Sequence, residues 1–450
     1  MVPNAMAWLG LYIVTFNCAR NPVDSDLFAN HIFDALPNSE AAVTASLPEI
    51  LVLSLQEIAP IAYAFLGGSW LDPYYEPIRR AVDQAAGAGS YRNVVTRNIG
   101  MTVIMIFVRE DVTDRVSWID TAEVGVGIQE VGNKGAVGAR FGYLVDRNSR
   151  DTVDLTFVAA HLAPDEFAVE RRNEDWRNIS QRLVFTRLDT ADAGTVRQRP
   201  HDEEQDEEGV PLLNTGSYPG ARSPALYAPN SYLFVAGDLN YRTSNKRPGP
   251  DDHLRFPRIT DDVGNPRHWA NLLASDQLTE ELKSRRTLHG LTEQPIEFPP
   301  TYKYSQKALD VAAGNGSSTE WNWSKNRWPS WCDRIMYLDT PFGVSGAEDR
   351  RVKAHKYDAL PLFPSSDHRA VVLSISVPLR ASAEPAAVLG LATYEIDPSW
   401  NTRRATARRK ELVVGAAAYA IFTREGNALV LATCLGLAAG IYALRAYFSG

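Results

Sequence analysis

The sequence is poor in cysteine and has no excess of basic residues, and both absences narrow the classes of protein that it can encode. Its 3 cysteines, Cys18, Cys332 and Cys434, are far apart along 450 residues. This spacing predicts neither a disulfide framework nor a zinc site, and it fits a reducing compartment. The formal net charge is −8, and segment 201–208 alone holds six carboxylates. The rest of the chain is nearly neutral, whereas nucleic-acid-binding proteins usually carry a basic surface, so nucleic acid is not an expected partner.

The N-terminal segment lacks the basic residues that precede the apolar core of a secretory signal peptide. Residues 5–16 are mostly apolar, but no Lys or Arg comes before them. We therefore do not expect export, and segment 10–16 is typical of a buried strand instead.

Short apolar runs rich in Val, Ile and Phe predict the strands of a layered α/β domain. Many of these runs are continuous rather than alternating, which is typical of strands that are buried on both faces. We therefore predict an α/β sandwich, in which two packed β-sheets lie between outer helices. The predicted helices are 26–36, 74–86, 167–188 and 269–273, and the predicted strands are 12–16, 50–55, 101–108, 135–141, 153–160, 232–235, 335–337 and 370–377.

Two polar stretches interrupt this pattern. Segment 190–230 contains the acidic run and then Pro, Gly, Ser and Asn, with few large apolar residues. Such a segment buries too little apolar surface to offset the entropy of ordering it, so we expect a disordered insertion without a catalytic role. Segment 308–325 is predicted to be a second loop.

The strand pattern ends at residue 378, and we expect the globular domain to cover 1–378. A linker follows over 379–427, with an irregular part up to residue 410 that ends in a basic stretch. Segment 412–422 is apolar but too short to span a bilayer, and an interfacial position for it is one alternative.

An uncharged apolar run at 428–444 predicts a C-terminal transmembrane helix. It would extend roughly 26 Å as a helix, near the short limit for a bilayer core. A buried core helix is the alternative, but the run lies beyond the globular pattern, which favours a membrane anchor. Basic residues on its upstream side predict that the domain lies in the cytosol. The spacing of Gly436 and Gly440 would permit weak self-association.

Polar residues follow several of the predicted strands, where a rigid scaffold can hold a solvated site. Asn17 and Glu57 follow the first two strands, and their oxygens are of the type that Mg²⁺ prefers. His161 follows a later strand. Asp238 and Asn240 follow another, and their i, i+2 spacing places both on the same side. Each residue alone is better explained as a turn cap, a surface ion pair or a structural side chain, whereas together they favour a site.

Five motifs occur in one order, at 132–137 (GNKGAV), 237–242 (GDLNYR), 300–303 (PTYK), 331–335 (WCDRI) and 366–369 (SDHR). This ordered set resembles the inositol polyphosphate 5-phosphatase family, within the endonuclease/exonuclease/phosphatase superfamily, over about residues 9–378. One motif has little specificity, but the ordered set is specific. The resemblance implies a DNase I-like fold, a four-layered sandwich with two mixed sheets, and a Mg²⁺-dependent phosphatase domain at 1–378. Phe16, Pro164 and Ala370 depart from the usual family residues, but none of these changes removes a reactive group.

The resemblance also implies a role for each candidate residue. Glu57 would bind Mg²⁺ with help from Asn17, and Asp238 would orient and activate the attacking water. The other implied catalytic residues are Asn240 and His161 at the scissile phosphate, His368 at the same phosphate with Asp333 setting its tautomer, and Asp367 in the metal and water network. The implied substrate contacts are Lys303, Arg334 and Tyr302, which would read a neighbouring 4-phosphate, and Lys134, Asn133 and Arg242, which would contact other phosphate oxygens.

These features favour an enzyme that converts phosphatidylinositol 4,5-bisphosphate to the 4-phosphate at the cytosolic face of a membrane. A tail-anchored fungal member of the family has the same layout, and a short span suits the thin endoplasmic reticulum membrane. One alternative substrate is a soluble inositol polyphosphate, although a tether favours the lipid. A catalytically inactive phosphoinositide-binding scaffold is an alternative from another class. Nucleases of the superfamily share much of the chemistry, but their usual patterns lack the PTYK and WCDR motifs.

Overall fold

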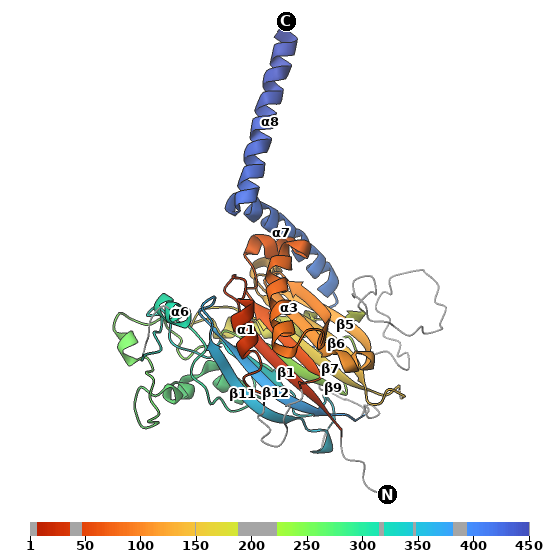
Figure 1. Cartoon of the computed structure of the whole chain (residues 1–450), viewed down its shortest axis with the longest axis vertical. Helices are drawn as coiled ribbons and strands as arrows, with labels where there is room; N and C mark the ends of the chain where they lie inside the picture. The colour runs from red at the N-terminus through yellow and green to blue at the C-terminus, as the bar shows by residue number, and fades with distance from the viewer. Residues whose placement is uncertain are drawn as a thin grey trace.

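The computed structural model describes residues 7–36, 47–148, 150–187, 223–314, 319–344, 348–380 and 394–449. Two six-stranded sheets pack face to face in this part of the chain, and helices cover their outer faces (Figure 1). Both sheets are mixed, since each contains one parallel pair among antiparallel ones. The predicted four-layered α/β sandwich is therefore confirmed.

The first sheet contains both N-terminal strands and the last two strands of the domain. Strand β1 lies at its centre, parallel to β2 and antiparallel to β12. In spatial order the strands are β11 (Lys353–Leu362), β12 (Arg369–Pro378), β1 (Trp8–Asn17), β2 (Ile50–Gln56), β4 (Thr102–Arg109) and β3 (Tyr91–Ile99).

The second sheet is built from the middle of the chain. Strand β7 is parallel to β9 and antiparallel to β6. In spatial order the strands are β10 (Asp333–Tyr337), β9 (Ser231–Asp238), β7 (Thr152–His161), β6 (Gly135–Leu144), β5 (Val116–Gly125) and the short β8 (Thr186–Arg187).

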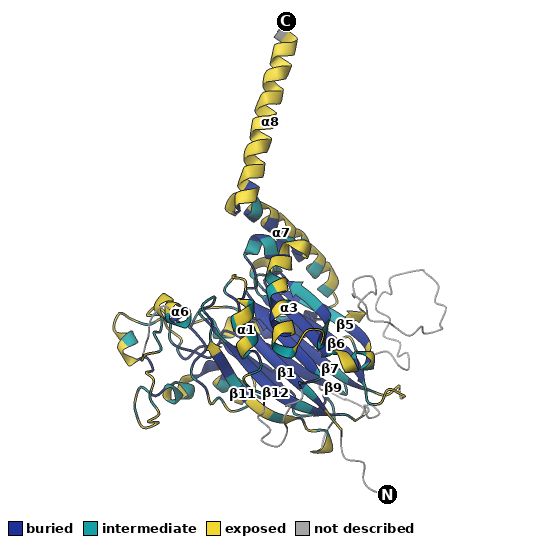
Figure 2. Cartoon of the chain, viewed as in Figure 1, coloured by how far each residue is buried: buried dark blue, intermediate teal, exposed yellow. Residues whose placement is uncertain are grey.

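The main core lies between the two sheets. Leu9 and Val52 of the first sheet pack in one cluster with Phe141 and Phe157 of the second. The outer face of the first sheet is covered by α1 (Ser25–His31), α2 (Ile61–Leu66) and α3 (Asp72–Ala86), and that of the second by α4 (Val169–Arg182) and α5 (Gln277–Lys283). Figure 2 shows the strands as the buried centre of the molecule.

Several local expectations were wrong. Strands β3, β5 and β11 were not predicted, and the predicted helix 167–188 ends at Arg182. Segment 308–325 is not entirely a loop, because α6 (Gln306–Ala312) enters it, and segment 269–273 lies in a 3-10 helix, Trp269–Ser275.

The last part of the expected disordered insertion, residues 223–230, belongs to the described structure. Its last residues are ordered, since Leu226 is buried and the Arg140 guanidinium donates to carbonyl oxygens of Ser223 and Ala225. The acidic run at 201–208 lies outside the described residues.

The linker is more ordered than its composition suggested. Helix α7 (Trp400–Phe422) replaces both the end of the predicted irregular stretch and segment 412–422. It packs on α2 through a buried stripe of Ala407, Glu411, Gly415 and Ala418. A second helix, α8 (Arg424–Ser449), then leads away from the body (Figure 1).

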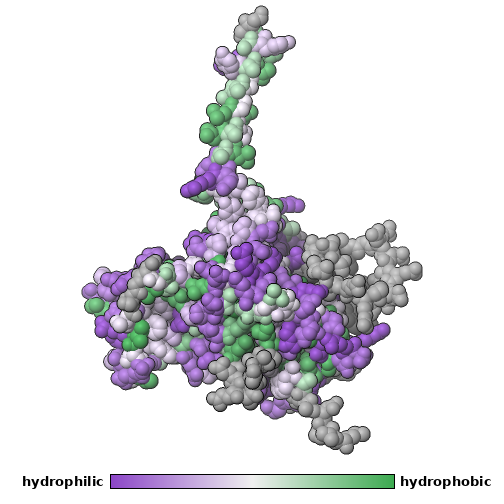
Figure 3. Space-filling model, viewed as in Figure 1, coloured by the Kyte–Doolittle hydropathy of each residue, from purple (hydrophilic) through white to green (hydrophobic). Residues whose placement is uncertain are grey.

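Helix α8 is long and apolar enough, over Arg424–Phe448, to cross a membrane, and its most apolar window is fully exposed. Figure 3 shows apolar residues along its length. Apart from the neighbouring backbone of α8 itself, no described residue lies within 4 Å of a Cβ atom built at Gly436 or Gly440.

Candidate active site

The site lies at one edge of the sandwich, where two strands of the first sheet and three strands of the second sheet end or begin. Asn17 is the last residue of β1, and Glu57 follows β2 with a positive φ of 46°. In the second sheet, His161 ends β7 opposite Asp238, which ends β9. Asp333 begins β10 on the other side of Asp238. Strand pairing therefore gathers Asn17 and Glu57 at one edge of the first sheet, and His161, Asp238 and Asp333 at one edge of the second sheet.

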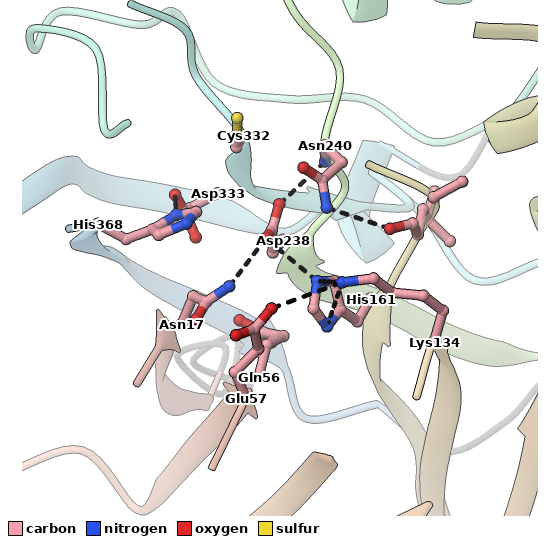
Figure 4. Close-up of polar contacts among 12 residues, drawn as sticks. Asn17, Gln56, Glu57, Lys134, His161, Asp238, Asn240, Cys332, Asp333 and His368 are labelled. Atoms are coloured by element: carbon pink, nitrogen blue, oxygen red, sulfur yellow. Dashed lines mark hydrogen bonds and ion pairs between the residues drawn. The ribbon is translucent and has the colours of Figure 1, made fainter. Parts of the chain in front are cut away.

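Asp238 links the two sheets at the site. Its Oδ2 accepts a hydrogen bond from Asn17 Nδ2 at 3.0 Å and lies 3.3 Å from Nε2 of His161 (Figure 4). Lys134 continues this network, since its Nζ contacts His161 Nε2 and lies 3.7 Å from Oε1 of Glu57. One connected set of polar side chains thus spans the gap between the sheets.

Charge in this network is unevenly distributed. Burial, reinforced by the ammonium of Lys134, lowers the pKa of His161, so its imidazole is neutral near pH 7. Burial would raise the pKa of Asp238, but its hydrogen bond to His161 and the nearby cations hold that pKa well below the usual range. Asp238 is therefore ionised and a weak base. It is suited to accept a hydrogen bond and so to orient its donor.

Asp333 and His368 form a second, separate pair. His368 Nδ1 lies 2.9 Å from Oδ2 of Asp333, which also accepts the hydroxyl of Thr301 at 2.7 Å. Burial disfavours a charged imidazole, but the Asp333 carboxylate, together with the nearby carboxylates of Asp238 and Asp367, raises the pKa of His368 to about 9. The ring packs on Tyr302, with centroids 4.4 Å apart.

The network around Asp238 and the Asp333–His368 pair face one another. Ligand-type atoms of Asp238, Asp333 and His368 all lie within 4.8 Å of one another. Because Nδ1 of His368 is engaged by Asp333, its Nε2 is the nitrogen left to donate to a bound anion. The arrangement offers a buried imidazolium beside a buried carboxylate, which is how an enzyme can hold an oxyanion next to an attacking water.

Asn240 and Arg242 form a rigid flank of the site. Asn240 Nδ2 donates to the carbonyl of Leu162 at 3.1 Å, and its Oδ1 accepts from the Arg242 guanidinium. The guanidinium lies over the Tyr302 ring, 4.6 Å from its centroid. Within the described residues, Nη1 of Arg242 is buried without a hydrogen-bond partner, so one donor remains for a ligand.

Lys303 and Asp367 lie together at another side of the site. Lys303 Nζ is 2.5 Å from Oδ2 of Asp367, and both side chains are partly exposed. Asn133, by contrast, turns back into its own loop, since a side chain on Gly127 would meet its Oδ1 at 1.8 Å. The Oδ1 of Asn133 has no hydrogen-bond partner within the described residues.

The structure does not bring Arg334 to the site, so the expected phosphate-reading role is corrected. Its side chain is fully buried, 3.1 Å from Asp276 and 2.5 Å from Glu293. Successive residues of a strand point to opposite faces, so Arg334 points away from the face to which Asp333 points. Two carboxylates already neutralise this guanidinium, which makes it part of the scaffold.

Two residues that support the site were given no role by the sequence. Thr301 donates to Asp333, and Ser366 Oγ donates to the carbonyl of Asn17 at 2.6 Å while accepting the N–H of His368 at 3.1 Å. Both residues lie inside motifs of the sequence, Thr301 in PTYK and Ser366 in SDHR, and this position was the feature of the sequence that could have identified them. The contacts of Thr301 with Asp333 and of Ser366 with Asn17 join residues that are distant in sequence, so they emerge only in the fold.

Comparisons with known proteins show the family of the chain. The family model described as Endonuclease/Exonuclease/phosphatase family 2 matches residues 14–374. Type II inositol polyphosphate 5-phosphatase 15 of Arabidopsis thaliana is 30% identical over 69% of this chain and 26% of its own length. Polyphosphatidylinositol phosphatase INP53 of Saccharomyces cerevisiae is 28% identical over 64% of this chain and 21% of its own. The chain thus spans about a quarter of these relatives.

A solved structure shows the same DNase I-like fold. The inositol polyphosphate 5-phosphatase domain of SpSynaptojanin, in complex with inositol (1,4)-bisphosphate and calcium ion, has a TM-score of 0.56 and 20% identity. The similarity covers 92% of this chain and 94% of that chain. With most of its globular domain matched, the chain belongs to the endonuclease/exonuclease/phosphatase family 2, and its curated relatives include inositol polyphosphate 5-phosphatases.

Proposed function

We propose that the chain is a phosphoinositide 5-phosphatase that converts phosphatidylinositol 4,5-bisphosphate to the 4-phosphate. The observation that carries this proposal is the position of Asp238, which bridges both sheets and faces the Asp333–His368 pair. The names of the relatives supply the substrate class. The proposed reaction is direct attack of water on the 5-phosphorus, with release of the inositol hydroxyl.

In this mechanism Asp238 accepts a hydrogen bond from the attacking water and aims its oxygen at phosphorus. Its depressed pKa makes it a weak base, but a loose phosphoryl-transfer transition state needs positioning more than proton removal. The imidazolium of His368 donates from Nε2 to a phosphate oxygen, where negative charge is concentrated. Neutral His161 and the Asn240–Arg242 pair line the other side of the space in which the water and the phosphate would lie.

Oxygen ligands for a divalent cation are present next to this space. Glu57 and Asp367 supply carboxylate oxygens and Asn17 supplies an amide oxygen, the hard donors that suit Mg²⁺. The carboxylate of Glu57 already has a positive charge nearby, since the ammonium of Lys134 lies 3.7 Å from it. In our proposal Glu57 holds Mg²⁺ with help from Asn17 and Asp367. The ion would neutralise charge on the scissile phosphate.

Basic side chains around the site would select the substrate. Lys303 would contact the 4-phosphate beside Tyr302, and Lys134 and Arg242 would contact the phosphate being removed. Lys134 is a point charge near the scissile position, whereas Arg242 offers a fixed donor in a buried setting. A soluble inositol polyphosphate presents the same ring phosphates, so it is the second candidate substrate.

The apolar helix supports the lipid over the soluble substrate. We propose that α8 anchors the chain in a membrane, with the catalytic domain on the cytosolic side and the endoplasmic reticulum as the membrane. A tethered enzyme meets lipid headgroups of the same membrane at a high effective concentration. The tether does not raise the effective concentration of a free inositol phosphate.

The test uses the full chain in detergent micelles with Mg²⁺. Phosphate release is measured from phosphatidylinositol 4,5-bisphosphate and from inositol 1,4,5-trisphosphate, and strand cleavage is measured for DNA. We expect release from the lipid, loss of activity in Asp238→Ala, and full activity in Asp261→Ala, which removes an exposed aspartate. If wild type and Asp238→Ala release phosphate equally poorly, the chain is an inactive scaffold, and DNA cleavage would indicate a nuclease.

A further inference from the structure

A buried carboxylate on α7 reaches the loop that carries Lys134. Glu411 is completely buried, and its Oε1 accepts the backbone N–H of Gly132 at 2.9 Å. Glu411 lies beyond residues 14–374, the segment matched by the family model. Burying a carboxylate costs free energy unless it is paired and hydrogen-bonded, so this contact with the loop is a specific feature of the fold.

Two arginines of α7 neutralise Glu411 and fix it against the domain. Arg404 Nη1 lies 3.2 Å and Arg408 Nη1 lies 3.4 Å from its carboxylate oxygens. Arg404 also pairs with Glu123 of β5 at 2.7 Å, and Arg408 donates to the carbonyl of Phe65 at 2.7 Å. The same side chains therefore charge-balance Glu411 and attach α7 to β5 and α2.

From Gly132 a chain of backbone hydrogen bonds continues into the site. The carbonyl of Gly132 accepts the N–H of Met101 at 3.1 Å, and the carbonyl of Met101 accepts the N–H of Ile58 at 3.2 Å. Ile58 directly follows Glu57, and Gly132 lies two residues before Lys134. Glu411 is thus linked through hydrogen bonds to the backbone next to Glu57, and through a short peptide to Lys134.

We propose that Glu411 is a positioning residue for Glu57 and Lys134, and that α7 holds the loop 127–134 in its active shape. The kinetic part of this inference rests on the proposed phosphatase function. Removing the acceptor takes away the partner of a buried N–H, which favours local opening of the loop. Displacement of Lys134 and Glu57 then weakens interactions that matter in the transition state, so kcat falls more than KM changes.

The test compares Glu411→Ala, Glu411→Gln and wild type as full chains in detergent micelles. Glu425→Ala is the matched control, because it removes an exposed glutamate at the start of α8. Hydrolysis of inositol 1,4,5-trisphosphate gives kcat and KM, and hydrogen exchange measures opening of peptide 127–134. In Glu411→Ala we expect a roughly tenfold lower kcat and a roughly tenfold faster exchange, the effect of losing one charge-assisted hydrogen bond.

Glu411→Gln keeps an oxygen acceptor for Gly132, so its kcat should stay within about threefold of wild type, since a neutral acceptor retains part of the bond. A purely structural role would lower the melting temperature without this rescue of kcat. If Glu411→Ala does not fold, Glu411→Asp decides, because the shorter side chain withdraws the acceptor from Gly132 and keeps the charge.

Wild-type kcat and wild-type exchange in the folded variant would overturn the positioning role. The two proposals fail in different ways. An inactive wild type would refute the phosphatase proposal alone, since exchange of peptide 127–134 still reports whether Glu411 holds the loop.

Discussion

The buried Asp333–His368 pair allows the pH dependence of the reaction to be predicted. His368 Nδ1 and Asp333 Oδ2 are 2.9 Å apart. The carboxylate, together with those of Asp238 and Asp367, raises the pKa of His368 to about 9 against the opposing effect of burial. Compared with the ordinary value of about 6.5, this favours the charged imidazole by about 3 kcal/mol. Asp333→Asn keeps the size of the side chain and removes its charge, while burial persists. The pKa of His368 should then fall to about 6.5, because Asp238 and Asp367 still oppose the effect of burial.

The consequence is large at pH 8. The imidazolium is about 90% populated in wild type and about 3% or less in Asp333→Asn, if only the protonated ring donates to phosphate. We expect kcat/KM for inositol 1,4,5-trisphosphate at pH 8 to fall about 30-fold, and the alkaline limb of the profile to move from near pH 9 to below about pH 7. Asp261→Asn, which changes an exposed aspartate, should leave the profile unchanged.

Unfolding provides an independent measurement of the same pair. Because the pKa of His368 is higher in the folded than in the unfolded chain, its contribution to stability is complete below about pH 6.5 and disappears as the pH rises through about 9. Urea unfolding of wild type should show this loss between the two pH values, and Asp333→Asn should not. An alkaline limb that stays near pH 9 in Asp333→Asn would refute the assignment of the charge to His368.

Three further predictions test the scaffold below the site, a substrate contact and the metal requirement. Arg334→Met leaves Asp276 and Glu293 as buried, unpaired carboxylates, so the free energy of unfolding in urea should fall by about 3–5 kcal/mol; a large rise in KM without loss of stability would instead restore a substrate role for Arg334. Lys303→Ala should lower kcat/KM about tenfold for substrates with a 4-phosphate, the loss of one charged hydrogen bond, and leave substrates without it nearly unaffected. Chelation of divalent cations should abolish phosphate release, and added Mg²⁺ should restore it; activity that persists in excess chelator would contradict the proposed role of Glu57.

The sequence predicted the strand-end residues of the site because their strands are continuous apolar runs. The ends of β1, β2, β7 and β9 were visible for this reason, and parallel neighbours necessarily end at the same edge. The convergence of the two sheets was not visible. The hydrogen bond between Asn17 and Asp238 joins residues 221 positions apart, and no local pattern encodes that contact.

The errors have identifiable physical causes. Strands β3 and β11 are edge strands of the first sheet, and their mixture of exposed and buried residues hides the apolar pattern. Arg334 follows Asp333 in a strand, so alternation of side chains already argued against placing both in one site. Helix α7 was missed because its N-terminal half is basic and its stability comes from distant partners such as Glu123 and Phe65.

The docking of α7 changes what the proposed membrane anchor does. A flexible linker would only raise the local concentration of substrate, and the domain would face the bilayer in many orientations. Here α7 approaches α2 so closely that a side chain on Gly415 would meet Cβ of Phe65 at 2.9 Å, and Arg404 and Arg408 fix its other half. Helix α2 follows the site strand β2, so the docked helix lies beside the active-site edge. With α8 in a membrane, the start of the anchor and the catalytic residues would therefore keep a fixed relation, which favours a headgroup presented from the same surface.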